Sequence, residues 1–433
     1  MLYIARYVIT QNDKREILED AALLVRGTVI EDIGKAAELK VKYPDEPIEN
    51  LGNAVIMPGL INAHTHIPMS FLRGYSDDKA LMDWLYKDIF PAEAKLAPEI
   101  VELATTLSCA ELLRFGCTAF YDMYMLEKAV FKSADRVGMR AVLGESVSSF
   151  FPSLDAKNID EFFESFDAND ELMKNHSLIR HAINPHAIYT TETAILQRCR
   201  QVADEKKIRF GIHMCETKTE TTGSLEKNKQ RPIAYCDSIG ILNENTTLIH
   251  MVDINADDIA TVAARGCATV HNPASNMKLA SGVAPIQEQL DAGIAVGLGT
   301  DGPASNNAQN MFREMYLAAL LQKLDKQDPL QMPVQAVLDM ATRGSATALG
   351  WANEIGSLEK GKAADFCALS LDESNMQPVH NVLSNVVYSA TGMENIITVV
   401  AGKELYKNGT YTTIDYANIL KEAMNLNDWL KNN

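Results

Sequence analysis

The stretch Met57-Pro58-Gly59-Leu60-Ile61-Asn62-Ala63-His64-Thr65-His66 joins a short apolar run to two histidines that are two positions apart. Side chains two apart on a strand point to the same side, so both imidazoles can reach one metal ion. Seven more apolar runs follow, each far enough from the last to leave room for a helix. The predicted strands are 55–60, 119–121, 141–143, 179–183, 210–212, 248–249, 268–270 and 294–298. Eight strands in βα alternation predict an α/β fold, a (β/α)₈ TIM-like barrel.

Polar residues that can do chemistry follow the ends of the predicted strands. They are His64, His66, Asp122, Glu145, His186, His213, Glu216, His250, His271 and Asp301. In a (β/α)₈ barrel the C-terminal ends of the strands meet at one face, and the active site lies there. The other three histidines, His176, His181 and His380, lie elsewhere. The sequence therefore predicts a cluster of histidines and carboxylates at one face of the barrel.

The two ends of the chain show a different pattern, in which short alternating strands are broken by turns. We expect residues 1–54 and 363–415 to form one small β-sandwich domain together. Residues 55–362 would then form the catalytic barrel between them. Residues 416–433 are predicted to form a C-terminal helix.

Composition limits the kinds of partner and the compartment. A formal net charge of −17 repels polyanions, which argues against nucleic acid. Seven cysteines occur singly and never as Cys-x-x-Cys, a pattern typical of reduced thiols in the cytoplasm. The N-terminus has no basic region followed by a long apolar run, and no stretch of about 20 apolar residues occurs. We expect a cytoplasmic protein, neither secreted nor membrane-bound, that acts on a small molecule.

Four of the strand-end residues form a plausible ligand set for one divalent metal ion. His64, His66 and His213 offer nitrogen, and Asp301 offers a carboxylate. This set suits Zn²⁺ best, with Fe²⁺ as a competitor. The predicted fourth strand ends in Asn184-Pro185-His186 and not in a lysine that could be carboxylated to bridge two metals. One ion is therefore expected, and its bound water would become a nucleophile near neutral pH.

Three side chains are candidates for moving protons around this metal. Asp301 could take a proton from the water as well as bind the metal. Glu216 lies three residues after His213 and can carry a proton to a ring nitrogen of the substrate, which helps ammonia to leave. His250 is placed to hydrogen-bond the nucleophile or the tetrahedral intermediate. A role for His250 as a fourth nitrogen ligand remains an alternative.

Four motifs together resemble those of the amidohydrolase superfamily, and within it the methylthioadenosine/S-adenosylhomocysteine deaminases and their triazine-hydrolase relatives. The motifs are Pro58-Gly-Leu-Ile-Asn-Ala-His-Thr-His66, His213-x-x-Glu216, His271-Asn-Pro-Ala-Ser-Asn-Met-Lys-Leu279 and Gly299-Thr-Asp-Gly302. The resemblance covers nearly the whole chain. It implies hydrolysis of an adenine nucleoside, such as 5′-methylthioadenosine, adenosine, 5′-deoxyadenosine or S-adenosylhomocysteine, to the inosine analogue and ammonia.

The same resemblance implies roles for particular residues. It repeats the four metal ligands and makes Glu216 the acid that protonates the purine ring. It places Glu93 on the ribose hydroxyls with Trp84 packed nearby, and it adds His186 as a substrate contact. His271 and Ser305 would also line the pocket.

One departure from the family concerns the tail of the substrate. Where the family typically has Arg-Gly after the third strand, this chain has Gly144-Glu145-Ser146. An arginine there is a natural partner for a substrate carboxylate, and an acid in its place would repel one. We therefore expect S-adenosylhomocysteine to be handled less well than nucleosides with short or apolar 5′ groups.

Two alternatives stay open. The site could hydrolyse another ring, as guanine or aminodeoxyfutalosine deaminases or triazine chlorohydrolases do, although a proton donor such as Glu216 favours loss of an amine. The chain could instead be a catalytically inactive barrel used as a scaffold, but every expected ligand position is filled. Barrels of this kind often assemble, so a homo-oligomer also remains open.

Overall fold

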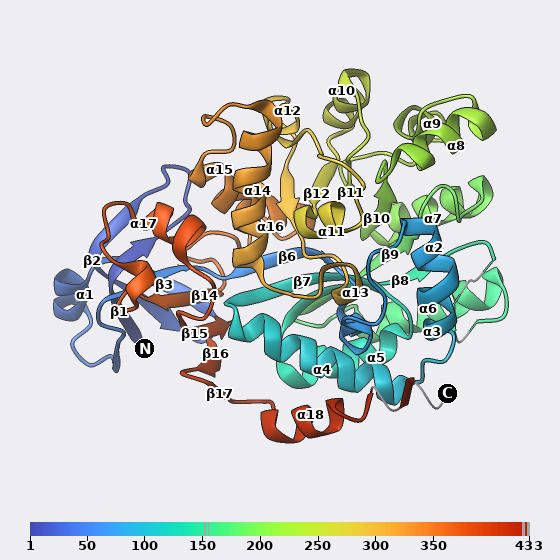
Figure 1. Ribbon diagram of the computed structural model, residues 1–433. Coiled ribbons are helices and arrows are strands. Elements are labelled where there is room, and N and C mark those ends of the chain that lie inside the picture. Colours follow the sequence, from blue (N-terminus) through green and yellow to red (C-terminus); the bar gives the residue numbers. More distant parts are fainter. Residues whose placement is uncertain (151–152, 155, 427–428, 431–433) are drawn as a thin grey trace.

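The computed structural model describes residues 1–150, 153–154, 156–426 and 429–430. It consists of a parallel barrel and a separate mixed sheet (Figure 1). Neighbouring barrel strands follow one another in sequence order and pair in parallel. The barrel strands are β6 (Leu60–Thr65), β7 (Cys117–Tyr124), β8 (Arg140–Val147), β9 (Ile179–Pro185), β10 (Arg209–Met214), β11 (Thr246–His250), β12 (Ala268–His271) and β13 (Val296–Leu298). The predicted (β/α)₈ barrel is confirmed.

The barrel is closed between its first and last strands by the residues that follow β13. All eight residues of β7 are buried, as expected for a parallel strand that is covered on both faces. At the closing seam, the Thr300 amide donates to Asn62 Oδ1 at 3.0 Å, and the Asp301 amide donates to the carbonyl of His64 at 3.0 Å. The seam therefore brings Asp301 beside the histidines at the end of β6.

Helices cover the outside of the barrel and connect its strands (Figure 1). They are α4 (Pro98–Arg114), α5 (Glu127–Val137), α6 (Ile159–Met173), α7 (Thr193–Lys206), α8 (Lys218–Asn228), α9 (Pro232–Ser238), α10 (Ala256–Arg265), α11 (Pro273–Lys278), α12 (Ile286–Asp291), α13 (Pro303–Asn306), α14 (Met311–Lys326), α15 (Val334–Asp339), η3 (Met340–Gly344) and α16 (Ser345–Ala348). Most of these helices place buried apolar side chains in the main hydrophobic core together with the strands.

A helical segment between β6 and α4 covers the C-terminal ends of the strands. It comprises η1 (Ile67–Leu72), α2 (Leu81–Trp84), η2 (Leu85–Ile89) and α3 (Phe90–Glu93), which together we call the cap. Met69, Trp84 and Ile89 of the cap are buried in one apolar cluster with Tyr124 and Met125 at the end of β7. The cap is thus fixed over the face where the sequence places the active site.

The first predicted barrel strand, residues 55–60, is divided between the two sheets. Ala54–Pro58 forms β5, which pairs in parallel with β1 (Leu2–Ile9) and antiparallel with β14 (Phe366–Ser370). The barrel strand β6 begins only at Leu60. Gly59 separates the two strands, and a Cβ there would lie 2.2 Å from the side chain of Thr118, so this crossing point requires glycine.

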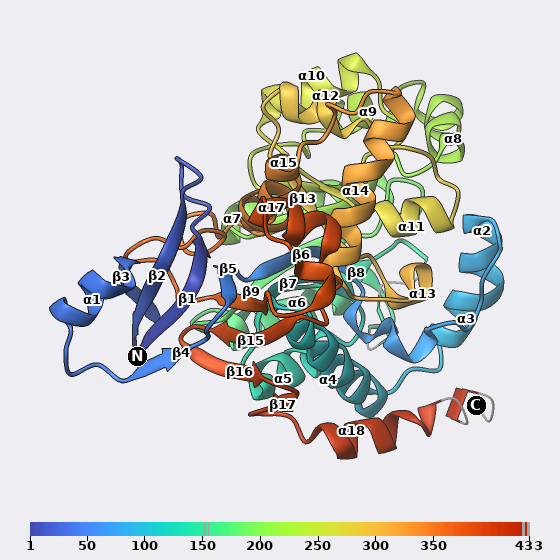
Figure 2. The same cartoon turned by 60° about the vertical axis from the view of Figure 1, so that its left-hand side comes forward.

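Both ends of the chain contribute strands to the mixed sheet, as predicted for one joint domain. Its remaining strands are β2 (Ile17–Arg26), β3 (Val29–Lys35), β4 (Ile48–Asn50), β15 (Asn395–Val400), β16 (Lys403–Lys407) and β17 (Thr410–Tyr411), and α1 (Ala36–Lys42) packs on it. Figure 2 shows β1, β2 and β3 to one side of the barrel. Arg140 of β8 ties the domains together through a buried ion pair with Asp365 at 2.7 Å.

The predicted C-terminal helix is interrupted by a turn. α18 covers Tyr416–Ala423 and lies along α4 (Figures 1 and 2), a turn follows at residues 424–425, and residues 426 and 429–430 are again helical. Residues 427–428 and 431–433 of the predicted helix lie outside the described residues. Within the described part of the chain, no helix has the length and apolar character needed to span a membrane.

Candidate active site

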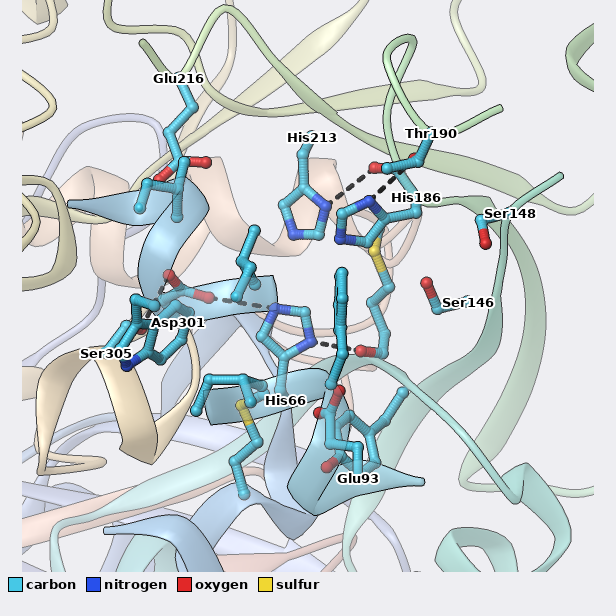
Figure 3. A pocket seen from close by; sticks show the side chains of 18 of the residues that line it. His66, Glu93, Ser146, Ser148, His186, Thr190, His213, Glu216, Asp301 and Ser305 are labelled. Carbon is cyan, nitrogen blue, oxygen red and sulfur yellow. Dashed lines mark hydrogen bonds and ion pairs between the residues drawn. The ribbon is translucent and has the colours of Figure 1, made fainter. Parts of the chain in front are cut away.

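The predicted metal ligands converge at the C-terminal ends of the barrel strands. Asp301 Oδ1 lies 3.2 Å from Nε2 of both His64 and His66. His213 Nε2 lies 3.3 Å from His64 Nε2. The side chains of His64, His213 and His250 also bring one nitrogen each within 4.8 Å of one another, as do the ligand atoms of His64, His66 and Asp301. Five residues from four strand ends therefore surround one point, as Figure 3 shows for His66, His213 and Asp301.

Backbone carbonyls hold two of these imidazoles so that Nε2 faces the centre of the group. His66 Nδ1 lies against the carbonyl of Met123, and His213 Nδ1 lies 2.8 Å from the carbonyl of His186. A carbonyl only accepts hydrogen bonds, so in each ring Nδ1 carries a proton and Nε2 is the nitrogen that is left to face a metal ion. This is the arrangement by which outer contacts orient histidine ligands in metal sites.

Asp301 is held in an unusual backbone conformation by two serines. Its φ of 61° is in the left-handed region, which is uncommon for a residue other than glycine. Its Oδ2 accepts hydrogen bonds from the Ser275 hydroxyl at 2.6 Å and the Ser305 hydroxyl at 3.0 Å. These contacts occupy one carboxylate oxygen and leave Oδ1 facing the histidines.

The electrostatics of the group favour a bound cation. Burial lowers the pKa of His64 to about 4 and that of His213 well below its usual range, so both rings are neutral ligands at pH 7. Burial also disfavours charge on His66, yet its hydrogen bond with Asp301 raises the His66 pKa to about 9. Although burial acts to raise it, hydrogen bonds with His64 and His66 hold the pKa of Asp301 well below its usual range. An anionic carboxylate that draws a proton onto its neighbour suits a divalent ion, and nitrogen with carboxylate donors suits zinc.

Glu216 and His250 lie next to this group and face each other. Glu216 follows β10, and its Oε2 is 3.9 Å from His250 Nε2. Asn276 Oδ1 lies 2.9 Å from His250 Nδ1 and so directs His250 Nε2 toward Glu216. Burial raises the pKa of Glu216, whose side chain is 7% exposed. A buried carboxyl of this kind can hold a proton and deliver it to a substrate.

A cavity of about 310 Å³ opens between the cap and the strand ends. Its wall carries His66, His213, Glu216, His250 and Asp301, and its opposite side carries Trp84, Phe90 and Glu93 of the cap. In Figure 3, Glu216 and Glu93 lie on opposite sides of His66. Burial raises the pKa of Glu93 to about 7, although the Tyr124 hydroxyl beside it acts in the other direction. The cavity thus presents one carboxyl group on each side of the metal-ligand group.

A model of the amidohydrolase family matches residues 55–405. The chain belongs to this family. It is 43% identical over 430 residues to a 5-methylthioadenosine/S-adenosylhomocysteine deaminase of Nitratidesulfovibrio vulgaris strain Miyazaki F, which covers 99% of this chain and 97% of that protein. The protein of the same name from Desulfovibrio desulfuricans is 44% identical, with 99% and 97% covered.

Solved structures of other proteins share this amidohydrolase barrel. A zinc-bound adenosine deaminase from Xanthomonas campestris superimposes with a TM-score of 0.96 at 35% identity and covers 100% of this chain and 98% of its own. A zinc-bound atrazine chlorohydrolase from Arthrobacter aurescens gives a TM-score of 0.91 at 24% identity, with 98% and 99% covered, and that likeness concerns the fold alone. The predicted family and fold are confirmed.

The amidohydrolase site contains most of the residues predicted to contact substrate. Trp84, Glu93, His186, Glu216 and Ser305 all line the cavity. His271 ends β12 and is 1% exposed, but it is not among the described residues that line the cavity. A contact between His271 and substrate stays a prediction that this arrangement does not support.

Two strand-end acids named in the sequence face away from the cavity. Asp122 Oδ1 accepts a hydrogen bond from the Ile67 amide at 2.5 Å, and the Glu145 carboxylate accepts one from the Ser153 hydroxyl. Ser146 and Ser148 line the cavity instead, so they occupy the place expected for Glu145 (Figure 3). The expected repulsion of a substrate carboxylate by Glu145 therefore has no structural basis.

Several lining residues were missed because they carry no motif. Tyr124, Tyr189 and Thr190 line the cavity, and Thr190 Oγ1 lies 3.0 Å from His186 Nδ1. The period of two along a strand would have found Met123 and Ser146, which also line the cavity, if the strand ends had been placed two to four residues later. Tyr189 follows β9 in a turn, and nothing in its sequence context marks it.

Proposed function

We propose that this amidohydrolase removes the exocyclic amino group of an adenine nucleoside by hydrolysis. The observation that carries the proposal is the buried, protonatable Glu216 beside a His/Asp metal-ligand group, with Glu93 across the same cavity. The products are ammonia and the nucleoside with a carbonyl oxygen at C6. The names of the relatives with 43–44% identity support this substrate class.

We propose one divalent ion, zinc, held by His64, His66, His213 and Asp301, since the ligand atoms of these residues converge. When bound, such an ion activates a water molecule for attack on an electrophilic carbon. The zinc reported in the Xanthomonas deaminase supports zinc over iron here. His250 lies near enough to be a further nitrogen ligand, but its contact with Glu216 supports a role in catalysis.

The protein residues move the protons of the reaction. Glu216 gives its proton to a ring nitrogen of the purine, which makes C6 electrophilic. Asp301 accepts the proton lost by the attacking water and passes it to the departing amine, and the hydroxyl proton of the intermediate goes to the Glu216 carboxylate, which forms the C6 carbonyl and restores the acid. His250, with a proton on Nε2, donates a hydrogen bond to the oxygen on which negative charge develops. Glu93 and His186 bind the ribose from the cap and from β9.

We further propose that the preferred substrate carries an uncharged 5′ group. None of the described residues that line the cavity is a lysine or an arginine, whereas Glu93, Glu216 and Asp301 are all acids. Phe90 and Phe150 lie at its mouth with ring centroids 6.4 Å apart, and Phe150 is 57% exposed. Apolar rings without a cation suit a methylthio group better than a carboxylate.

Ammonia release from a panel of amino-substituted rings tests this function. The zinc-loaded protein is offered 5′-methylthioadenosine, adenosine, S-adenosylhomocysteine, aminodeoxyfutalosine, guanine and a chlorotriazine. We expect the adenine nucleosides to be deaminated, with kcat/KM for methylthioadenosine at least about tenfold above that for S-adenosylhomocysteine, since one charged contact corresponds to about 1.5–3 kcal/mol. Preference for S-adenosylhomocysteine would contradict the uncharged tail, and preference for guanine or the triazine would contradict the function.

A Glu216→Gln variant tests the proton donor. Glutamine keeps the size of the side chain but cannot donate an acidic proton to the ring, so ammonia release should fall by about 10²–10⁴-fold. Metal content should be unchanged because Glu216 is not a ligand. Full activity in this variant would show that another group is the acid.

A further inference from the structure

Glu220 is a buried carboxylate that lies behind Glu216 and outside the cavity. It is on the first turn of α8, it is 4% exposed, and both of its oxygens are occupied. Oε1 accepts a hydrogen bond from the Cys215 amide at 3.0 Å, and Oε2 accepts one from the Glu216 amide at 2.9 Å. One carboxylate therefore binds the backbone of the proposed acid and of the residue before it.

This arrangement differs from an ordinary helix cap. In α10, Asp258 at the third helical position accepts from the amide of its own capping residue, Asn255, at 3.0 Å. The N-cap residue of α8 is Thr217, and its hydroxyl accepts a hydrogen bond from the Glu220 amide at 3.3 Å. Glu220 reaches past Thr217 to the two preceding residues. Its contacts thus order the loop after β10 and not only the helix end.

The loop that Glu220 binds is bent in a way that needs support. Cys215 has a φ of 53°, in the left-handed region that residues with a Cβ rarely adopt. This bend ends the course of β10 and directs the side chain of Glu216 toward the metal-ligand group. Two consecutive amides bound by one carboxylate stabilise such a bend.

The same loop is tied to the residues that follow His250. The carbonyl of Cys215 accepts from the Val252 amide at 3.0 Å and the Asp253 amide at 2.8 Å. His250 and Met251 also have left-handed φ values, 79° and 50°. The 3.9 Å separation of Glu216 and His250 therefore depends on two bent loops that share hydrogen bonds. Glu220 holds one of them from the side away from the substrate.

We propose that Glu220 is a positioning residue, which acts on the reaction by fixing the backbone from which Glu216 delivers its proton. This inference rests on the proposed role of Glu216 as the acid. Glu220 touches neither the cavity nor the metal-ligand group, so its loss should change turnover and leave substrate affinity and metal binding intact. Small displacements of a reacting group cost about 10²-fold in rate.

The principal test is Glu220→Gln, with Glu394→Gln as its matched control. Glutamine offers one acceptor where two amides need two, so one amide loses its partner. Glu394 is also buried, at 5% exposed, and its Oε2 accepts from two consecutive amides, those of Thr391 and Gly392, both at 2.9 Å. Its Oε1 accepts from the Asn375 side-chain amide at 2.6 Å and the Thr391 hydroxyl at 3.0 Å, so Glu394→Gln also removes an occupied acceptor. It lies in the loop before β15, beside the end of α4, and it does not line the cavity.

We expect kcat for ammonia release to fall about 10- to 100-fold in Glu220→Gln with KM changed less than about threefold. The control should keep kcat within about twofold. When Glu216→Gln is already present, adding Glu220→Gln should lower kcat by less than about a further threefold, because the two residues act as one unit. An equal loss in both backgrounds, or in the control, would show a general structural effect and overturn the proposal.

Amide hydrogen exchange tests the same inference without activity. The Cys215 and Glu216 amides should exchange at least about tenfold faster in Glu220→Gln than in the parent protein. A shorter variant, Glu220→Asp, should give intermediate exchange and turnover. Unchanged exchange in both variants would overturn the proposal. If the parent protein released no ammonia from any nucleoside, the proposed function would fail, whereas the exchange data would still decide whether Glu220 orders this loop.

Discussion

Two groups of buried side chains that contain histidine are built in opposite ways on the same barrel: a cluster of histidines, and one histidine between two acids. At the C-terminal strand ends, four imidazoles face one another, with ring centroids of His64 at 4.8 Å from His66 and 5.0 Å from His213. On the outside of β9, His181 lies alone between two acids, Glu127 Oε2 at 3.0 Å and Asp170 Oδ1 at 3.2 Å. Its ring stacks on Phe166 with centroids 4.2 Å apart.

The pKa shifts separate the two groups. Burial lowers the pKa of His64 to about 4, because neighbouring imidazoles and low solvent access disfavour a charge there. Burial also acts against charge on His181, but Glu127 and Asp170 outweigh it and raise its pKa to about 9. His181 has all the charge partners that it needs, so it is a structural residue. The first group combines neutral imidazole nitrogens with one anionic carboxylate, a donor set that can bind a cation.

The largest effect should come from removing the carboxylate of the first group. Asp301 is the only acid among the described residues that form the candidate metal-ligand groups, and Asp301→Asn removes its negative charge. We expect loss of the bound divalent metal and a fall in ammonia release of at least about 10³-fold. Metal analysis and single-turnover assays measure both. A variant that keeps stoichiometric metal and full activity would show that the first group does not need the Asp301 carboxylate to bind a cation.

The sequence predicted the first group well because topology alone determines it. Parallel strands of a barrel end at one face, so His64, His213 and Asp301 meet even though the first and the last are 237 positions apart in the sequence. Only the existence of the strands had to be recognised. Their exact ends had little influence on which residues were placed together.

Details that depend on single-residue register could not be predicted in this way. A shift of one residue along a strand turns a side chain to the other face, which is why Asp122 and Glu145 were expected near the substrate while Ser146 and Ser148 line the cavity. The cap residues lie in short irregular helices without a repeating pattern, so Trp84 and Glu93 came from family resemblance. The contact of Glu220 with two amides depends on a backbone bend that no motif marks.

A smaller effect is expected from the second group, and it concerns stability. His181→Gln removes the charge that Glu127 and Asp170 bind, so the free energy of unfolding at pH 6 should fall by about 3 kcal/mol. The raised pKa means that this stabilisation is full below the unfolded pKa of about 6.5 and disappears as pH rises through about 9. Denaturant unfolding at pH 6 and pH 10 should therefore show the parent and variant converging. Metal content and kcat should be unchanged.

The smallest effect should come from His176, a half-buried histidine with an exposed partner of the same kind as one of those of His181. His176 Nε2 lies 3.0 Å from Asp135 Oδ1, but the Asp135 side chain is 55% exposed and that of Asp170 is only 12% exposed. Solvent screens the exposed pair, so Asp135→Asn should change the free energy of unfolding by less than about 0.5 kcal/mol. Asp170→Asn removes a carboxylate that lies 3.2 Å from His181 Nδ1 inside the protein, and it should lower the free energy of unfolding by at least about 1.5 kcal/mol. Equal losses in these two variants would show that burial does not set the strength of the histidine–carboxylate pairs, and the contrast between the two buried groups would then need another cause.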